Sequence, residues 1–130
     1  MRILVGYDGS NVSKEALSVA RRHALALQAS VNVVTSMEKG TEEEQQAIED
    51  AECGLEWAKT GFVEKGVPCK THLLIRGLAP GEDLVGFARE NDADMIVVGV
   101  KRRSKVGKLL MGSTAQFVIL HASCPVMTVK

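Results

Sequence analysis

The sequence predicts a single-domain α/β fold over residues 1–130, with an open five-stranded parallel sheet covered by helices on both faces. Its length corresponds to one domain. Five short apolar runs alternate with four segments whose apolar residues recur at helical spacing, an order typical of parallel strands joined by crossover helices. Aromatic residues make up only 4% of the chain, so Val, Leu, Ile and Ala must form the core, as in most buried parallel sheets.

The first half of the chain contains two predicted strands and two predicted helices. A strand at residues 3–7 ends in a turn cluster at 8–11 that also supplies helix N-cap candidates. Apolar residues then recur at helical spacing over 12–28, including Leu27, and a second strand follows at 31–36. The segment from 38 to 62 is strongly acidic but keeps an apolar stripe, which predicts a short loop followed by a helix with a solvated face.

The second half of the chain repeats the alternation. We expect a strand at 71–75, a helix at 80–90 and a strand at 95–99 that is apolar on both faces and therefore central. The last helix has one apolar face, and a final strand is predicted at 125–129. The residues of that helical face are Ala115, Val118, Ile119 and Ala122.

Charge and composition exclude several classes of partner. Sixteen basic and sixteen acidic side chains cancel to a formal net charge of zero, which disfavours nucleic acid or an anionic membrane as a partner. No apolar run approaches the roughly 20 residues of a membrane span, and the N-terminus does not have the pattern of a secretory signal. Cys53, Cys69 and Cys124 are odd in number and share no close spacing, which favours free thiols and a cytoplasmic location.

Candidate binding residues follow two of the strands. Ligands of open parallel sheets bind beyond the carboxyl ends of the strands. The first strand ends in Asp8 and small residues, and the fourth ends in Gly99. Five of the eight residues from 101 to 108 are basic, and the helix that begins near Ser113 offers free backbone N–H groups.

This combination predicts a phosphate-binding loop, in which the hydroxyls of Ser113 and Thr114 help to hold the anion. A structural interpretation stands beside it. In that interpretation Gly99 only lets the strand end turn, Ser113 only caps a helix, and the lysines only keep a surface loop soluble. Neither of the common glycine-rich nucleotide motifs is present at these positions.

The chain resembles the universal stress protein family over its whole length. The resemblance runs from the opening Ile-Leu-Val-x-x-Asp-Gly-Ser to the closing Cys-Pro-Val-x-x-Val. The nucleotide-binding branch of that family carries Gly, two residues, Gly, nine residues, Gly and then Ser or Thr. This sequence keeps the spacing with Gly99, Gly112 and Ser113, but Arg102 replaces the middle glycine.

The resemblance implies a sheet of strand order 3-2-1-4-5 and an adenine nucleotide, ATP or AMP, as ligand. The adenine is expected near Asp8 and Ser36. The phosphates are expected on the loop that contains Gly99, Lys101 and Arg102, and on the backbone of residues 112–114. The resemblance also implies homodimers that pair through the last strand, residues 126–129, and a role in stress survival and signalling.

Arg102 is compatible with a nucleotide in terms of energy. At a position of positive φ, any residue other than glycine costs about 1–2 kcal/mol. A guanidinium bonded to phosphate oxygens contributes about 1.5–3 kcal/mol in the opposite direction. The two effects are comparable, so the substitution does not exclude a nucleotide.

Three functional hypotheses follow. In the first, the protein binds ATP or AMP and acts as a stress-response sensor or signalling module. In the second, Arg102 closes the site and the protein acts through dimerisation and partner binding alone. In the third, Asp8 holds magnesium and the protein hydrolyses ATP slowly. We predict neither a covalent catalytic set that uses a histidine nor a histidine metal site, because the histidines lie on three different predicted elements: His23, His72 and His121.

Overall fold

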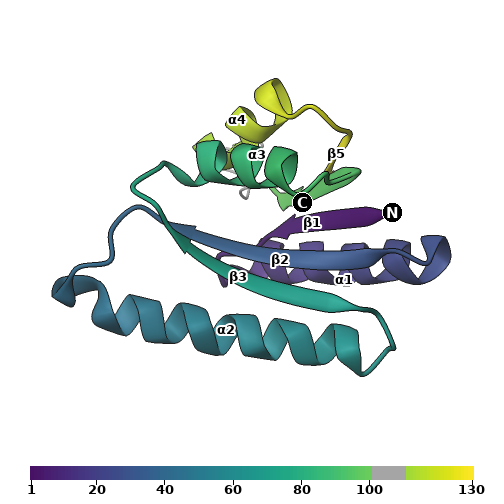
Figure 1. Cartoon of the computed structure of the whole chain (residues 1–130), viewed down its shortest axis with the longest axis horizontal. Helices are drawn as coiled ribbons and strands as arrows, with labels where there is room; N and C mark the ends of the chain where they lie inside the picture. Colours follow the sequence, from purple (N-terminus) through teal and green to yellow (C-terminus); the bar gives the residue numbers. More distant parts are fainter. Residues whose placement is uncertain (101–110) are drawn as a thin grey trace, which may run out of the picture.

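The computed structural model describes residues 1–100 and 111–130, which form one α/β domain (Figure 1). The five strands form a single parallel sheet of order β3-β2-β1-β4-β5, which confirms the predicted fold class and strand order. The elements in chain order are β1 (Arg2–Gly6), α1 (Asn11–Leu27), β2 (Ser30–Met37), the 3₁₀ helix η1 (Glu42–Glu44), α2 (Gln45–Val63), β3 (Cys69–Ile75), α3 (Pro80–Glu90), β4 (Met95–Gly99), α4 (Ser113–His121) and β5 (Val126–Val129).

The helices cover both faces of the sheet, α1 and α2 on one side and α3 and α4 on the other (Figure 1). Side chains alternate along a strand, so one strand supplies both cores. In β1, Ile3 and Val5 pack in the α1–α2 core, whereas Leu4 packs in the α3–α4 core. All three are at most 1% exposed, as expected for a central strand.

Two residues of the predicted helical stripes lie at the surface instead of in the core. Leu27 is 46% exposed because α1, at about 25 Å, is longer than the five-residue strand β1, at about 17 Å, so its last turn extends beyond the sheet. Ile119 is 40% exposed because the short helix α4 buries only Ala115 and Val118. Strand β3 also begins at Cys69, two residues before the predicted start.

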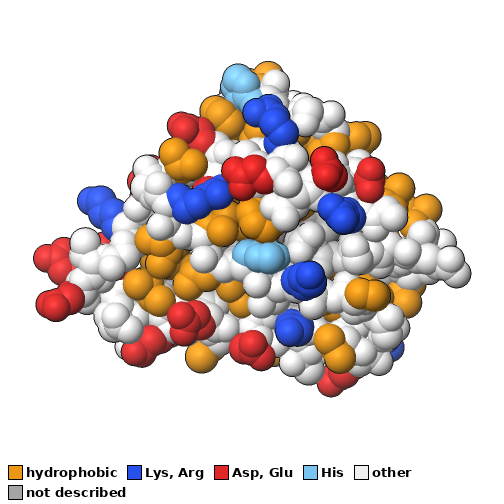
Figure 2. All heavy atoms as spheres, viewed as in Figure 1, with side chains coloured by type: hydrophobic (Ala, Val, Ile, Leu, Met, Phe, Trp, Pro, Cys, Tyr) orange, Lys and Arg blue, Asp and Glu red, His pale blue; other side chains and the backbone are white. Residues whose placement is uncertain are grey.

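The acidic segment is solvated, as predicted. Residues of η1 and of the first turns of α2 are mostly exposed, and the buried residues of α2 are Leu55, Ala58 and Phe62. Figure 2 shows acidic side chains at the end of the molecule where α2 begins, and both signs of charge over the rest of this face. Within residues 1–100 and 111–130, no helix is long and apolar enough to cross a membrane.

A close approach of α3 to α4 depends on Gly81. A Cβ atom at this position would lie 2.7 Å from Cβ of Phe117, closer than real Cβ contacts allow, and 3.1 Å from its Cγ. The glycine therefore sets the distance between α3 and the helix that follows the basic loop.

We expect Gly81→Ala to lower the free energy of unfolding by about 2 kcal/mol, because the added methyl forces the two helices apart. Urea denaturation at equilibrium measures the change. Gly86→Ala is the matched control: it lies on the same helix, and the nearest atom to its new Cβ is Oε1 of Glu90 at 3.9 Å. That variant should be neutral or stabilised by up to about 1 kcal/mol, because alanine favours the helix. Equal stability of both variants would contradict the prediction.

Candidate functional site

A cavity of about 530 Å³ opens at the carboxyl ends of β1, β2 and β4. Its volume lies in the range of small-molecule sites. The wall on the α3 side is apolar and is formed by Val34, Pro80, Leu84 and Val98. Polar groups come from the turn after β1, from the first turn of α1, from the end of β2 and from the start of α4. They include those of Asp8, Ser10, Ser13, Ser36, Ser113 and Thr114.

The start of α4 supplies hydrogen-bond donors to the cavity. Its N-cap is Gly112, in an extended conformation (φ −68°, ψ 159°), and a glycine has no side chain of its own with which to cap the helix. The N–H groups of the first turn have no acceptor within their own helix, and the helix dipole makes this end electropositive. Residues 112–115 line the cavity, so this end of the cavity suits an anion.

Two parts of the structural interpretation of these residues are wrong. Ser113 is the first residue of α4 and not its cap, because the N-cap position belongs to Gly112. Gly99 does more than let the strand turn: a Cβ atom there would lie 2.9 Å from Cγ1 and 3.0 Å from the carbonyl oxygen of Val12. The glycine therefore allows the first turn of α1 to pack against the end of β4.

The turn after β1 is held by its own hydrogen bonds. The Ser10 hydroxyl accepts from the Ser13 backbone N–H at 3.2 Å and caps α1, and a carboxylate oxygen of Asp8 accepts from the Ser10 N–H at 2.9 Å. Burial acts to raise the pKa of Asp8, but hydrogen bonds from Ser10 and Ser13 outweigh it and lower the pKa below its usual value. Asp8 is therefore negatively charged at neutral pH.

The ends of β1 and β2 are joined beside the cavity. The Tyr7 N–H donates to the Val34 carbonyl at 2.9 Å, and the buried Thr35 hydroxyl donates to the Tyr7 carbonyl at 2.7 Å. The Tyr7 ring packs against α2, where a Cβ atom at Gly54 would lie 3.2 Å from it. These contacts hold this side of the cavity in place without any ligand.

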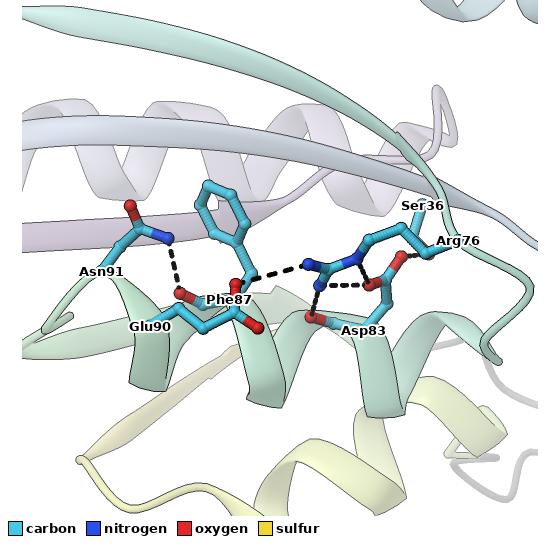
Figure 3. A network of polar contacts seen from close by, with 6 residues as sticks. All are labelled: Ser36, Arg76, Asp83, Phe87, Glu90 and Asn91. Atoms are coloured by element: carbon cyan, nitrogen blue, oxygen red, sulfur yellow. Dashed lines mark hydrogen bonds and ion pairs between the residues drawn. The ribbon is translucent and has the colours of Figure 1, made fainter.

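Ser36 belongs to a polar network that the sequence analysis missed. Its hydroxyl donates to Asp83 of α3, which also accepts from Arg76 (Figure 3). An acidic residue in the first turn of a helix is usually solvated, so the sequence carried no signal that Asp83 is fully buried. The sequence did carry a signal for Val34 as a lining residue of the cavity. Val34 lies two residues before Ser36, and residues two apart on a strand share the same face.

The structure brings together most of the residues that the sequence analysis named. Six of the eight line the cavity: Asp8, Ser36, Gly99, Gly112, Ser113 and Thr114. Lys101 and Arg102, and with them the rest of the basic loop, lie outside the described residues. The residues of the first and fourth strand ends thus form one site with residues of β2 and α4.

The histidines make separate contacts. His23 is bonded to the Val19 carbonyl and His72 to the Asn32 side chain, each at 2.9 Å, and His121 lies against Phe117. In the described part of the chain, no group of three or more His, Cys, Asp or Glu residues is placed to hold a metal ion.

A family model described as the universal stress protein family matches residues 1–130. The chain belongs to this family. Among curated universal stress proteins, one from Thermus aquaticus is 35% identical to it over 137 residues, which cover 98% of this chain and 97% of the relative.

Two solved structures from Archaeoglobus fulgidus have the same fold as this universal stress protein. One is a universal stress protein with 38% identity and a TM-score of 0.91, covering 100% of this chain and 98% of the other. The second is a universal stress protein in complex with dAMP. It has 34% identity and a TM-score of 0.82, covering 100% of this chain and 98% of the other. The likeness to both extends over the strands and helices that form the cavity.

Proposed function

We propose that this universal stress protein binds an adenine nucleotide, ATP or AMP, in the cavity at the carboxyl ends of β1, β2 and β4. The observation that carries the proposal is the N-terminus of α4, with a glycine at its N-cap, at one side of a cavity whose wall toward α3 is apolar. A nucleotide has the matching polarity, because its phosphates are anionic and its base is flat and largely apolar.

The proposed orientation follows from the walls of the cavity. The phosphates lie against the backbone N–H groups of residues 112–114, with the hydroxyls of Ser113 and Thr114 as further donors. The base lies on the other side of β1, between Val34 and Leu84. Gly99 and Asp8 lie between the two ends, and Lys101 and Arg102 follow Gly99 in the sequence.

The dAMP complex of the 34% identical relative supports the adenine nucleotide. The proposal covers ATP and AMP alike, because the backbone N–H groups at the start of α4 can donate to the phosphate oxygens of either. Asp8 is negatively charged and lines the cavity, so it is the residue that we propose for a magnesium ion accompanying ATP.

The proposed biological role is that of a cytoplasmic stress-response sensor or signalling module. The bound nucleotide would contact residues from β1, β2, α3 and α4, so its presence changes the stability of a large part of the fold. The three cysteines are free and Cys53 is exposed, a state that persists in a reducing compartment.

We further propose a homodimer that pairs through β5. This strand is at one edge of the sheet, and an edge strand leaves half of its backbone groups available to another chain. Light scattering after gel filtration should then give twice the 14.0 kDa mass of one chain. A mass of 14.0 kDa at micromolar concentration would overturn the dimer and leave the nucleotide proposal standing.

Nucleotide binding is tested with the purified full chain. We expect adenine nucleotide in the supernatant after denaturation, and we expect heat when ATP or AMP is titrated into nucleotide-free protein, with and without magnesium. At a ligand concentration 100 times the Kd, the free energy of unfolding should rise by about 2.7 kcal/mol. No co-purified nucleotide and no heat at millimolar ATP would overturn the proposal and favour action through protein partners alone.

A further inference from the structure

A buried carboxylate determines which atoms the cavity presents at Ser36. Asp83 is fully buried on α3. One of its oxygens, Oδ1, accepts from Nε of Arg76 at 2.6 Å, and the other, Oδ2, accepts from the Ser36 hydroxyl at 2.6 Å. Figure 3 shows the carboxylate of Asp83 between these two side chains, with Arg76 also reaching Glu90 at 3.3 Å.

The hydrogen bond between Ser36 and Asp83 has only one possible direction. An ionised carboxylate accepts hydrogen bonds and has no proton to donate, whereas a serine hydroxyl has a single proton and two lone pairs. The shared proton therefore belongs to Ser36 and points at Asp83. Ser36 lines the cavity, and its hydroxyl oxygen has only lone pairs left to offer a ligand.

Ser36 lies at the base end of the proposed nucleotide site, and the inference rests on that proposed function. It belongs to β2, which β1 separates from β4 and from the helix end that would hold the phosphates. The other residues that β2 and α3 contribute to the cavity lining are apolar: Val34, Pro80 and Leu84. Ser36 is thus the polar side chain that β2 and α3 offer to the polar edge of a base between Val34 and Leu84.

We propose that Ser36, oriented by Asp83 and Arg76, is an obligatory hydrogen-bond acceptor that selects bases with an exocyclic amino group. Adenine presents such an amino group at C6. Hypoxanthine has the same shape but carries an oxygen there, and this oxygen faces the lone pair of Ser36 without a proton between them. Ser36 is thereby a specificity residue, and Asp83 and Arg76 are its positioning residues.

The first test compares ATP with ITP by calorimetry on the wild-type protein. We expect ATP to bind about tenfold more tightly, because one hydrogen bond is lost and two acceptors are opposed in the ITP complex. Purine riboside 5′-monophosphate, which lacks the amino group, should bind more weakly than AMP. Equal affinities for ATP and ITP would overturn the inference, whereas binding of neither would overturn the proposed function itself.

The second test reverses the direction of the hydrogen bond. In Asp83→Asn, the Arg76 guanidinium retains the side-chain oxygen as its acceptor, so the new amide NH₂ faces Ser36 and donates to it. The Ser36 proton is then free to point into the cavity, where it suits the oxygen of hypoxanthine. We expect the ATP-over-ITP preference to fall from about tenfold to one or below, a change that a merely structural role would not produce.

Two further variants complete the design. Ser36→Ala removes the acceptor and should abolish the preference even if Asp83→Asn proves too unstable to assay. Glu90→Gln is the matched control, because it touches Arg76 but not Asp83, and it should keep the wild-type preference. Circular dichroism verifies that each variant is folded. A folded Asp83→Asn or Ser36→Ala variant that keeps the tenfold preference would overturn the inference.

Discussion

Ser113→Asp is expected to weaken ATP binding by about 100-fold while leaving the fold intact or slightly more stable. Ser113 is the first residue of α4 and lines the cavity. A carboxylate there competes with phosphate for the same N–H groups, and two like charges about 4 Å apart repel by about 4 kcal/mol at an effective dielectric constant near 20. Solvent at the mouth of the cavity screens part of this repulsion. Calorimetric titration with ATP measures the loss.

The stability of the same variant makes the test specific. An acidic side chain in the first turn interacts favourably with the helix dipole, so the free energy of unfolding should rise by about 0.3–1 kcal/mol. Ser113→Asn is the control, because it has the size of aspartate without the charge and should bind ATP within a few-fold of wild type. If Ser113→Asp bound ATP as well as Ser113→Asn does, the phosphates would not lie at this helix end.

Arg76→Ala is expected to lower the free energy of unfolding by about 3 kcal/mol. The substitution removes the cation that faces Asp83, whose side chain is 0% exposed. It leaves a buried charge whose other side-chain partner among residues 1–100 and 111–130 is Ser36. Breaking a buried ion pair in this way costs about 3–5 kcal/mol. We expect the lower end of that range, because the Arg76 side chain is itself 35% exposed and water can enter the space that it leaves.

The second ion pair of Arg76 provides a matched comparison. Glu90 is 59% exposed, and a pair at the surface contributes at most about 1 kcal/mol. Glu90→Gln should therefore change stability by less than 1 kcal/mol in urea denaturation. Similar losses in Arg76→Ala and Glu90→Gln would show that Asp83 is not the partner that matters. The buried pair also joins the end of β3 to α3, so its loss should affect the base end of the cavity.

These two predictions concern opposite ends of one cavity. Substitution of Ser113 tests anion binding at the end of the cavity formed by the start of α4. Substitution of Arg76 tests how Ser36 is held at the end lined by Val34 and Leu84. A nucleotide that spans both ends should be sensitive to each substitution, but for different reasons. Charge repulsion weakens binding in the first case, and loss of orientation of Ser36 weakens base discrimination in the second.

The fold class and the cavity residues at the start of α4 were predictable from the amino-acid sequence. The spacing of apolar residues along this chain alternates between strand and helix patterns. This spacing is a local property, so it can be read without knowing which segments pack against one another. The start of α4 near Ser113 was recognisable for the same reason, because hydroxyl-bearing residues before a helical pattern predict where a helix begins. The extents of the helical faces were less predictable, since Leu27 is exposed only because α1 extends beyond the sheet.

The direction in which Ser36 presents its hydroxyl depended on the three-dimensional packing. Asp83 is 47 residues away from Ser36 in the chain. The Asp83 side chain is buried only because α3 packs against β2 and because Arg76, the residue after β3, contacts the same carboxylate. Local sequence patterns report on helices and strands, whereas the burial of a charge depends on which distant segments surround it. The position of the cavity therefore follows from the order of the elements, and its hydrogen-bonding character at Ser36 follows from contacts between them.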